Sequence, residues 1–138
     1  MLNKIDKSRL IAVKKDKILV LEKIGGKKRY SLAGGIKKKK ETDCQSLIRE
    51  TFEEIGVTLK EQDLTYFLSR KNINKENQEI YKHYFITIKS IQKEIEVLEL
   101  HKFKKALWIH WHDTLEHLDK DDRRSIALYF NQLRTQVS

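Results

Sequence analysis

The 138-residue sequence contains no proline and a single cysteine, Cys44. Because no proline-rich or Gly/Ser-rich stretch marks a linker, we expect one domain over residues 1–138. A lone cysteine excludes an internal disulfide and favours a cytoplasmic setting. No segment approaches the roughly 20 consecutive apolar residues of a membrane-spanning helix, so we expect no membrane insertion.

Positive charge exceeds negative charge by nine, and much of the excess lies in short lysine clusters at residues 14–15, 27–28 and 37–40. Such an excess attracts polyanions, whether nucleotides, polyphosphates or RNA, and the charge alone does not choose among them. Short, separated clusters are more typical of solubilising loops than of a nucleic-acid surface. An RNA-binding module therefore stays an alternative that rests on charge alone, since no aromatic-rich RNA-binding motif is present.

Short apolar runs with strand character alternate with two segments of helical periodicity. The first two runs flank the polar turn 14–17 and predict a hairpin, and residues 72–78 form a polar connector between two later runs. We expect a mixed sheet sandwiched between helices, an α/β (α+β) fold. The expected strands are 9–13, 18–21, 29–33, 64–69, 80–89 and 106–111, and the expected helices are 42–55 and 121–136, the second carrying Ile126, Ala127, Tyr129, Phe130 and Leu133 on one stripe.

The helix over residues 42–55 has clear signals at both ends. Thr42 and Gln45 have the spacing of a capping box, and Gly56 supplies a stop. Its side chains divide between an apolar arc, expected to face the core, and an acidic arc, expected to face a ligand. The apolar arc holds Leu47, Ile48, Thr51, Phe52 and Ile55, and the acidic arc holds Ser46, Glu50, Glu53 and Glu54.

The acidic arc places like charges three and four residues apart, where each pair destabilises an exposed helix by roughly 0.2–0.5 kcal/mol. A bound divalent cation reverses that repulsion. Mg²⁺ prefers carboxylate oxygens and completes its shell with water and substrate phosphates, which suits an open acidic face. Taken without further context, the same pattern also fits a solvated acidic face that binds nothing.

The segment from Gly35 to Val57 resembles the Nudix box. In that motif a glycine, a glutamate and an Arg-Glu-x-x-Glu-Glu-x-Gly core follow one another at fixed spacing. Eight of the nine specified positions agree over 23 residues, and the exception is Thr51, where an aliphatic residue is usual. Outside the box, Ala33 replaces a common proline and Lys40 a common glycine. The resemblance implies a Nudix-type α/β/α sandwich and a hydrolase that cleaves the pyrophosphate of a nucleotide or nucleoside diphosphate derivative.

The resemblance also implies roles for individual residues. Glu50, Glu53 and Glu54 would hold Mg²⁺, for which Mn²⁺ substitutes, with the Gly35 carbonyl as a further ligand. Arg49 and Glu41 would form an ion pair that orients these glutamates. The general base stays open between Glu50 and an acid of a later loop, Glu99 being nearest to Trp108 and Glu94 and Glu96 farther away. Arg29 and Lys37 are candidate substrate-binding residues, and Tyr30 fits either a substrate contact or the core.

Several other features have plainer interpretations. His110, His112 and Asp113 do not supply a convincing set of zinc ligands, so we assign no zinc there. Trp108 and Trp111 are oddly spaced and are expected to face opposite sides, one of them filling the core. Cys44 is expected to pack as a small apolar side chain. The leading alternative function is a non-catalytic Nudix-like nucleotide sensor, and the oligomeric state, a homodimer included, is not decided by the sequence.

Overall fold

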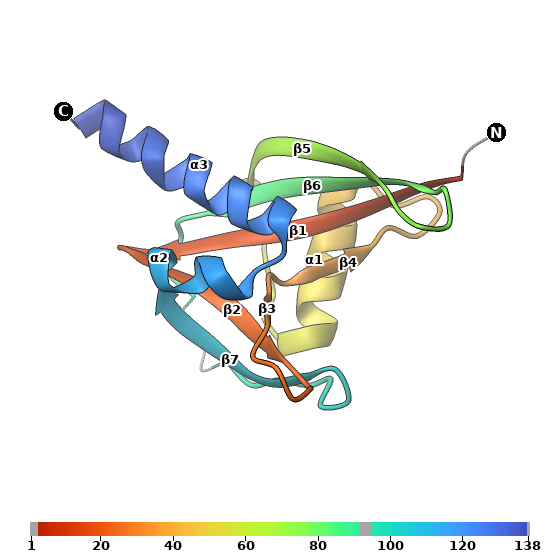
Figure 1. The fold of residues 1–138 in the computed structure, drawn as a ribbon, viewed down its shortest axis with the longest axis horizontal. Helices are drawn as coiled ribbons and strands as arrows, with labels where there is room; N and C mark the ends of the chain where they lie inside the picture. Colours follow the sequence, from red (N-terminus) through yellow and green to blue (C-terminus); the bar gives the residue numbers. More distant parts are fainter. Residues whose placement is uncertain (1–2, 92–94, 138) are drawn as a thin grey trace.

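A computed structural model describes residues 3–91 and 95–137. Strands lie on both sides of a central helix in the chain, and a long helix closes it (Figure 1). In order, the elements are β1 (Lys4–Lys14), β2 (Lys17–Lys23), β3 (Tyr30–Ser31), β4 (Gly34–Ile36), α1 (Asp43–Ile55), η1 (Glu61–Asp63), β5 (Thr65–Ile73), β6 (Glu79–Thr87), β7 (Phe103–His110), α2 (Trp111–Thr114), η2 (Leu115–His117) and α3 (Lys120–Val137).

Within the described part of the chain, seven strands form one mixed sheet. β1 and β6 run parallel, while the remaining pairs are antiparallel. β1 and β2 pair only next to the hairpin turn and then separate, so that β1 pairs with β4 and β2 pairs with β3 and β7. The expected single strand 29–33 is therefore wrong: the chain leaves β2 after Ser31 and joins β1 at Gly34.

Helices cover both faces of the sheet, which confirms the expected sandwich. α1 lies behind the strands in Figure 1, and α3 lies in front of them. Because successive strand residues point to opposite faces, Leu10 and Leu19 pack in the core beneath α1, while Ile11 and Ile18 pack beneath α3. A sheet covered on both faces requires such continuous apolar runs.

The two tryptophans lie in different cores, as their spacing predicted. Trp108 packs against the α1 side, whereas Trp111 is 5% exposed and stacks on Phe130 of α3 at 4.9 Å between ring centroids. Trp111 begins α2 and is not part of the expected strand 106–111. The other expected elements are present, with ends shifted by a few residues; β5, for example, extends to Ile73 inside the expected connector.

The predicted caps of α1 are confirmed. Thr42 Oγ1 accepts from the Gln45 backbone N–H, and Gln45 Oε1 accepts from the Thr42 backbone N–H, each at 3.0 Å. Gly56 ends the helix with a left-handed φ of 69°, a conformation that glycine adopts without steric cost. No described helix combines the length and the apolarity that crossing a membrane would need.

Candidate active site

The glutamates of α1 meet a turn of backbone at the start of β4. The Gly34 backbone N–H donates to Glu54 Oε1 at 2.9 Å. At Gly35, an added Cβ would lie 2.4 Å from the Glu50 carboxylate carbon, far inside van der Waals contact. Consecutive glycines therefore let the strand backbone approach two carboxylates of the helix at once.

The expected arcs of α1 need three corrections. Phe52, expected in the core, is 53% exposed, and Ser46, expected on the open acidic face, is fully buried. Glu54 is also buried, since only 4% of its surface is exposed. The packed face of the helix is thus rotated toward the acidic arc, because the β4 backbone, and not an apolar surface alone, covers that side. Of the three glutamates, only Glu50 and Glu53 border solvent.

Burial sets the protonation of Glu54. Desolvation raises its pKa to about 8, although the Gly34 hydrogen bond and the charge of Arg9 both oppose the rise. The neighbouring carboxylates of Glu50 and Glu99 raise the pKa further. Burial thus favours the protonated form of Glu54, and a divalent metal ion bound beside it would favour the ionised form.

Arg49 joins the loop before α1 to the glutamates. Its guanidinium donates to Glu41 through Nε at 2.6 Å and Nη2 at 3.0 Å, which confirms the predicted ion pair. Nη1 reaches Glu50 Oε1 at 3.0 Å and Glu53 Oε2 at 3.2 Å, and Nη2 also donates to the Ile36 carbonyl at 3.2 Å. One planar group therefore fixes three acids and the β4 backbone relative to one another.

The donor set fits a hard divalent cation. Glu50, Glu53 and Glu54 offer carboxylate oxygens from one helix, and one arginine neutralises only part of their charge. The Glu50 side chain is 15% exposed and that of Glu53 is 45% exposed, so these two leave room for water and a ligand. Partial exposure of carboxylates is the arrangement that Mg²⁺ sites favour over a closed cage.

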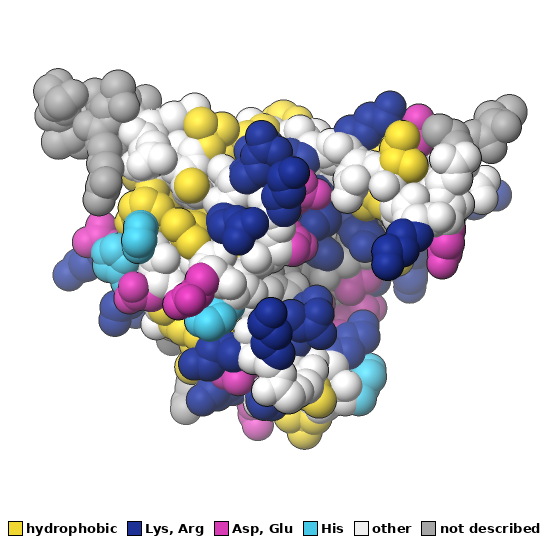
Figure 2. Space-filling model, in the orientation of Figure 1, with side chains coloured by type: hydrophobic (Ala, Val, Ile, Leu, Met, Phe, Trp, Pro, Cys, Tyr) yellow, Lys and Arg dark blue, Asp and Glu magenta, His cyan; other side chains and the backbone are white. Residues whose placement is uncertain are grey.

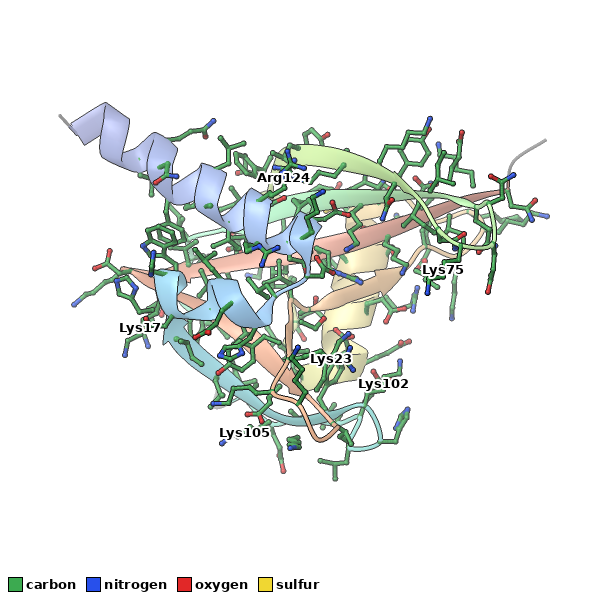
Figure 3. The ribbon with its side chains drawn as sticks, viewed as in Figure 1. Lys17, Lys23, Lys75, Lys102, Lys105 and Arg124 are labelled. Atoms are coloured by element: carbon green, nitrogen blue, oxygen red, sulfur yellow. The ribbon has the colours of Figure 1, made fainter. Side chains whose placement is uncertain are left out.

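A basic cavity of about 220 Å³ lies beside this site. Arg9 lines the cavity, and its charge also lowers the pKa of Glu54, so Arg9 links the cavity to the glutamates. Figure 3 shows Lys23 near the middle of the molecule, beside the loop from β2 to β3, and this residue also lines the cavity. The other lining residues are Lys27, Lys28, Arg29, Tyr30, Ser31, Glu116, His117, Leu118, Asp119 and Asp122.

The two candidate substrate residues lie in different places. Arg29 lines the basic cavity, whereas Lys37 lines a separate hollow of about 580 Å³ with the other lysines of the box loop. Lys37 Nζ lies 3.9 Å from Asp43 Oδ1. Tyr30 is 7% exposed and belongs to the core on the α3 side while it also borders the cavity.

Sequence reasoning missed Arg9, Asp119 and Asp122. Asp122 is buried and accepts a hydrogen bond from the Tyr84 hydroxyl, while Lys82 Nζ donates to Asp119 Oδ2 at 2.8 Å. This network anchors the start of α3 and thereby forms one wall of the basic cavity. The available signal was charge within apolar runs: Arg9 lies in β1 and Lys82 in β6, where charged residues are rarely buried without a partner.

The remaining candidate residues lie in several different places. Glu99 is close enough to Glu54 to raise its pKa, Glu96 is exposed, and Glu94 falls outside the described residues. His110, His112 and Asp113 are exposed and form no metal-sized cluster within the described chain. Cys44 packs at the edge of the core, and burial raises the pKa of its thiol.

Lys40 occupies the position in the box loop where glycine is common. Lys40 has a φ of 73°, the left-handed conformation that favours glycine. On the face of the molecule drawn in Figure 2, Lys and Arg side chains lie in several separate groups with acidic and apolar side chains between them. This distribution matches the separated clusters in the sequence.

Comparisons with known proteins identify the fold and the family of the chain. A sequence profile described as NUDIX domain matches residues 6–129, whereas no curated protein sequence matches significantly. The E. coli ORF135 protein is similar in structure, with a TM-score of 0.78 and 18% identity over 94% of this chain and 91% of that one. A MutT NUDIX hydrolase from Burkholderia pseudomallei has a TM-score of 0.78 and 17% identity, covering 91% of this chain and 97% of that one.

An Ap4A hydrolase from C. elegans has the same fold as well. Its TM-score is 0.76 at 16% identity, and the match covers 95% of this chain and 98% of that one. At these identities the structural likeness shows the fold, while the sequence profile, which spans most of the chain, shows the family. The chain belongs to the Nudix family.

Proposed function

We propose that the protein is a Mg²⁺-dependent pyrophosphohydrolase that cleaves the diphosphate of a nucleotide or of a nucleoside diphosphate linked to another group. One observation carries the proposal: two of the three glutamates of α1 meet the glycine turn of β4, and Arg9 connects them to a basic cavity. Mg²⁺ bound by Glu50, Glu53 and Glu54 would neutralise the diphosphate and make water more acidic. Mn²⁺ is expected to substitute.

The residues of the chain supply positioning and proton transfer. Arg49 holds Glu50 and Glu53 in place through Nη1 and is itself held by Glu41. A water that attacks phosphorus in line must lose a proton, and a carboxylate within hydrogen-bond reach can accept it. Glu50, at the edge of the site, and Glu99, whose charge acts on Glu54, are the two candidates for this step.

The basic cavity suits the anionic part of the substrate. Arg9, Lys23 and Arg29 place positive charge around a space large enough for a phosphorylated group. Asp119 and His117 also line the cavity and offer hydrogen-bonding groups to a nucleobase or sugar. Solved relatives described as an Ap4A hydrolase and a dihydroneopterin triphosphate pyrophosphohydrolase, the latter from E. coli, bear names that agree with a nucleotide-like substrate.

A panel of nucleoside diphosphate derivatives, hydrolysed in ¹⁸O-labelled water with Mg²⁺, tests this proposal. We expect a nucleoside monophosphate and a phosphorylated remainder, with one labelled oxygen in one product only. The labelled product identifies the phosphorus that water attacks. Tight binding of a panel member without turnover by the wild-type protein would instead favour a non-catalytic nucleotide sensor. Release of unlabelled products would contradict water attack on phosphorus.

A further inference from the structure

A second cluster of potential metal ligands lies at the other end of α1. It comprises Asp6 of β1, Asp43 at the first position of α1 and His83 of β6, and one ligand atom from each lies within 4.8 Å of the others. Asp6 Oδ1 lies 2.7 Å from His83 Nε2, and Asp43 Oδ1 lies 3.8 Å from the same nitrogen. Glu50 lies seven positions after Asp43 in α1, a rise of about 10 Å. The cluster is therefore distinct from the glutamate site.

The fold holds these three residues together through the backbone. β1 and β6 pair in parallel, with Ser8 opposite His83, so Asp6 lies two residues before the strand position that faces the histidine. The Ser8 hydroxyl donates to the Asp43 carbonyl at 2.8 Å and ties the start of α1 to the same strand. The three side chains therefore come from three elements whose mutual positions are fixed.

The imidazole is oriented toward the carboxylates. Ser69 Oγ lies 2.6 Å from His83 Nδ1, and it is also 2.7 Å from the Tyr66 hydroxyl. When Nδ1–H donates to Ser69, the lone pair of Nε2 faces Asp6, and the two groups repel unless a cation lies between them. A histidine that ligates a metal usually donates its other ring N–H to a nearby oxygen in this way.

An unpaired carboxylate oxygen provides a second, independent observation. Asp43 Oδ1 is inaccessible to solvent and has no hydrogen-bond partner. Its nearest cationic neighbour outside the cluster is Lys37 Nζ at 3.9 Å, too far for a hydrogen bond. A buried carboxylate oxygen without a partner costs free energy, which a cation at this point would recover.

We propose that Asp6, Asp43 and His83 form a binding site for a divalent transition metal, with Zn²⁺ the best match. One imidazole and two carboxylates suit zinc better than magnesium, which prefers oxygen ligands alone. Ligand atoms of a tetrahedral zinc lie roughly 3.4 Å apart, given Zn–N and Zn–O bonds of about 2.1 Å. The distances of 2.7 Å and 3.8 Å bracket this value, so small side-chain rotations form the site.

Such a site would fasten the start of α1 to β1 and β6 in the folded protein. Zinc binding to the folded state raises the melting temperature, by roughly 9 °C at a hundredfold excess over Kd. Lys4 Nζ and Lys37 Nζ, each 3.9 Å from a carboxylate oxygen of the cluster, are partly exposed and move aside when the metal binds. Because the cluster lies about 10 Å along α1 from Glu50, zinc affinity is expected to be independent of the glutamates of α1.

Titration calorimetry and thermal denaturation with Zn²⁺ alone, after chelator treatment, test this proposal. We expect a wild-type site of one Zn²⁺ that a Glu50→Gln/Glu53→Gln double variant retains. His83→Gln and Asp43→Asn are each expected to weaken binding roughly tenfold or more. His112→Gln, at an exposed histidine outside the cluster, serves as the matched control and is expected to bind as the wild type does.

Thermal denaturation of each variant in chelator shows whether the substitution removes only a metal ligand or also destabilises the fold. If His83→Gln unfolds in chelator, Asp43→Asn carries the test, because the Asp43 side chain is 34% accessible and its replacement is isosteric. Unchanged Zn²⁺ affinity in both His83→Gln and Asp43→Asn would overturn the proposal. So would loss of the zinc-dependent stabilisation only in the glutamate double variant, because the zinc would then occupy the proposed Mg²⁺ site.

Discussion

Arg49 and Glu41 form a bidentate ion pair, with Nε–Oε2 and Nη2–Oε1 distances of 2.6 Å and 3.0 Å. The pairing lowers the pKa of Glu41 to about 2 and raises the pKa of Arg49 above its ordinary value. Both groups stay charged throughout the neutral range. The remaining face of the same guanidinium contacts Glu50 and Glu53, so a pair outside the acid cluster determines its geometry.

Arg49→Lys tests this positioning role. Lysine keeps the charge but loses the planar fork, so the carboxylates lose their common anchor. Turnover is expected to fall roughly tenfold to a hundredfold, as for other residues that orient metal ligands, while the melting temperature changes little. Steady-state kinetics and thermal denaturation measure the two effects. An unchanged turnover would mean that the acids hold their geometry without Arg49.

Gly35→Ala tests the close approach of β4 to α1. The new Cβ would lie 2.4 Å from the Glu50 carboxylate carbon, so this flexible side chain has to rotate away. Displacing a reacting group by about 1 Å can lower activity on the order of a hundredfold. Gly26→Ala is the matched control, because an added Cβ there meets nothing within 4 Å. Equal activity of the two variants would contradict the predicted role of the approach.

Glu54 makes the metal-free protein sensitive to pH. Its pKa is about 8 in the folded state and about 4.5 in the unfolded state, so the folded state binds the extra proton between these values. The stabilising contribution of this proton is complete below pH 4.5 and is lost as pH rises through 8. Glu54→Gln is expected to flatten the decline. Chemical denaturation in chelator at pH 6 and pH 9 measures it, and an identical pH profile in wild type and variant would contradict this assignment.

Two lysines of β2 offer a matched test of the basic cavity. Lys23 lines the cavity, whereas Lys17 lies at the opposite end of the strand (Figure 3). Lys23→Gln is expected to raise KM roughly threefold to tenfold, since a hydrogen bond to a charged group contributes about 1.5 kcal/mol or less when partly solvated. Lys17→Gln is expected to leave KM unchanged. Equal effects of both variants would mean that only general charge matters.

Local patterns in the sequence were sufficient to predict several features. Thr42, Gln45 and Gly56 define the ends of α1 because capping depends on residues that are neighbours in the chain. The Arg49–Glu41 pair was implied by the resemblance to the Nudix box, and the structure contains it. The two short apolar runs 9–13 and 18–21, with a polar turn between them, were enough to predict the hairpin of β1 and β2.

Long-range packing explains the errors. The burial of Glu54 depends on the Gly34 backbone, 20 residues away, and helical periodicity cannot predict which face a distant strand covers. The break between β3 and β4 arises because two strands with different partners separate, which a continuous apolar run does not reveal. The Asp6, Asp43 and His83 cluster likewise requires the parallel pairing of β1 with β6.

The most direct test of the central claim is the rate of pyrophosphate hydrolysis as a function of Mg²⁺ concentration, for the wild type and Glu53→Gln. Glu53 is half-exposed and touches only Arg49 among the ion pairs of the described chain, so its neutral replacement should preserve the fold. We expect wild-type activity that saturates with Mg²⁺ and disappears in excess chelator, and a variant that needs more Mg²⁺ and turns over far more slowly. Full activity in chelator, or an unchanged Mg²⁺ dependence in Glu53→Gln, would contradict the assignment of these glutamates as metal ligands.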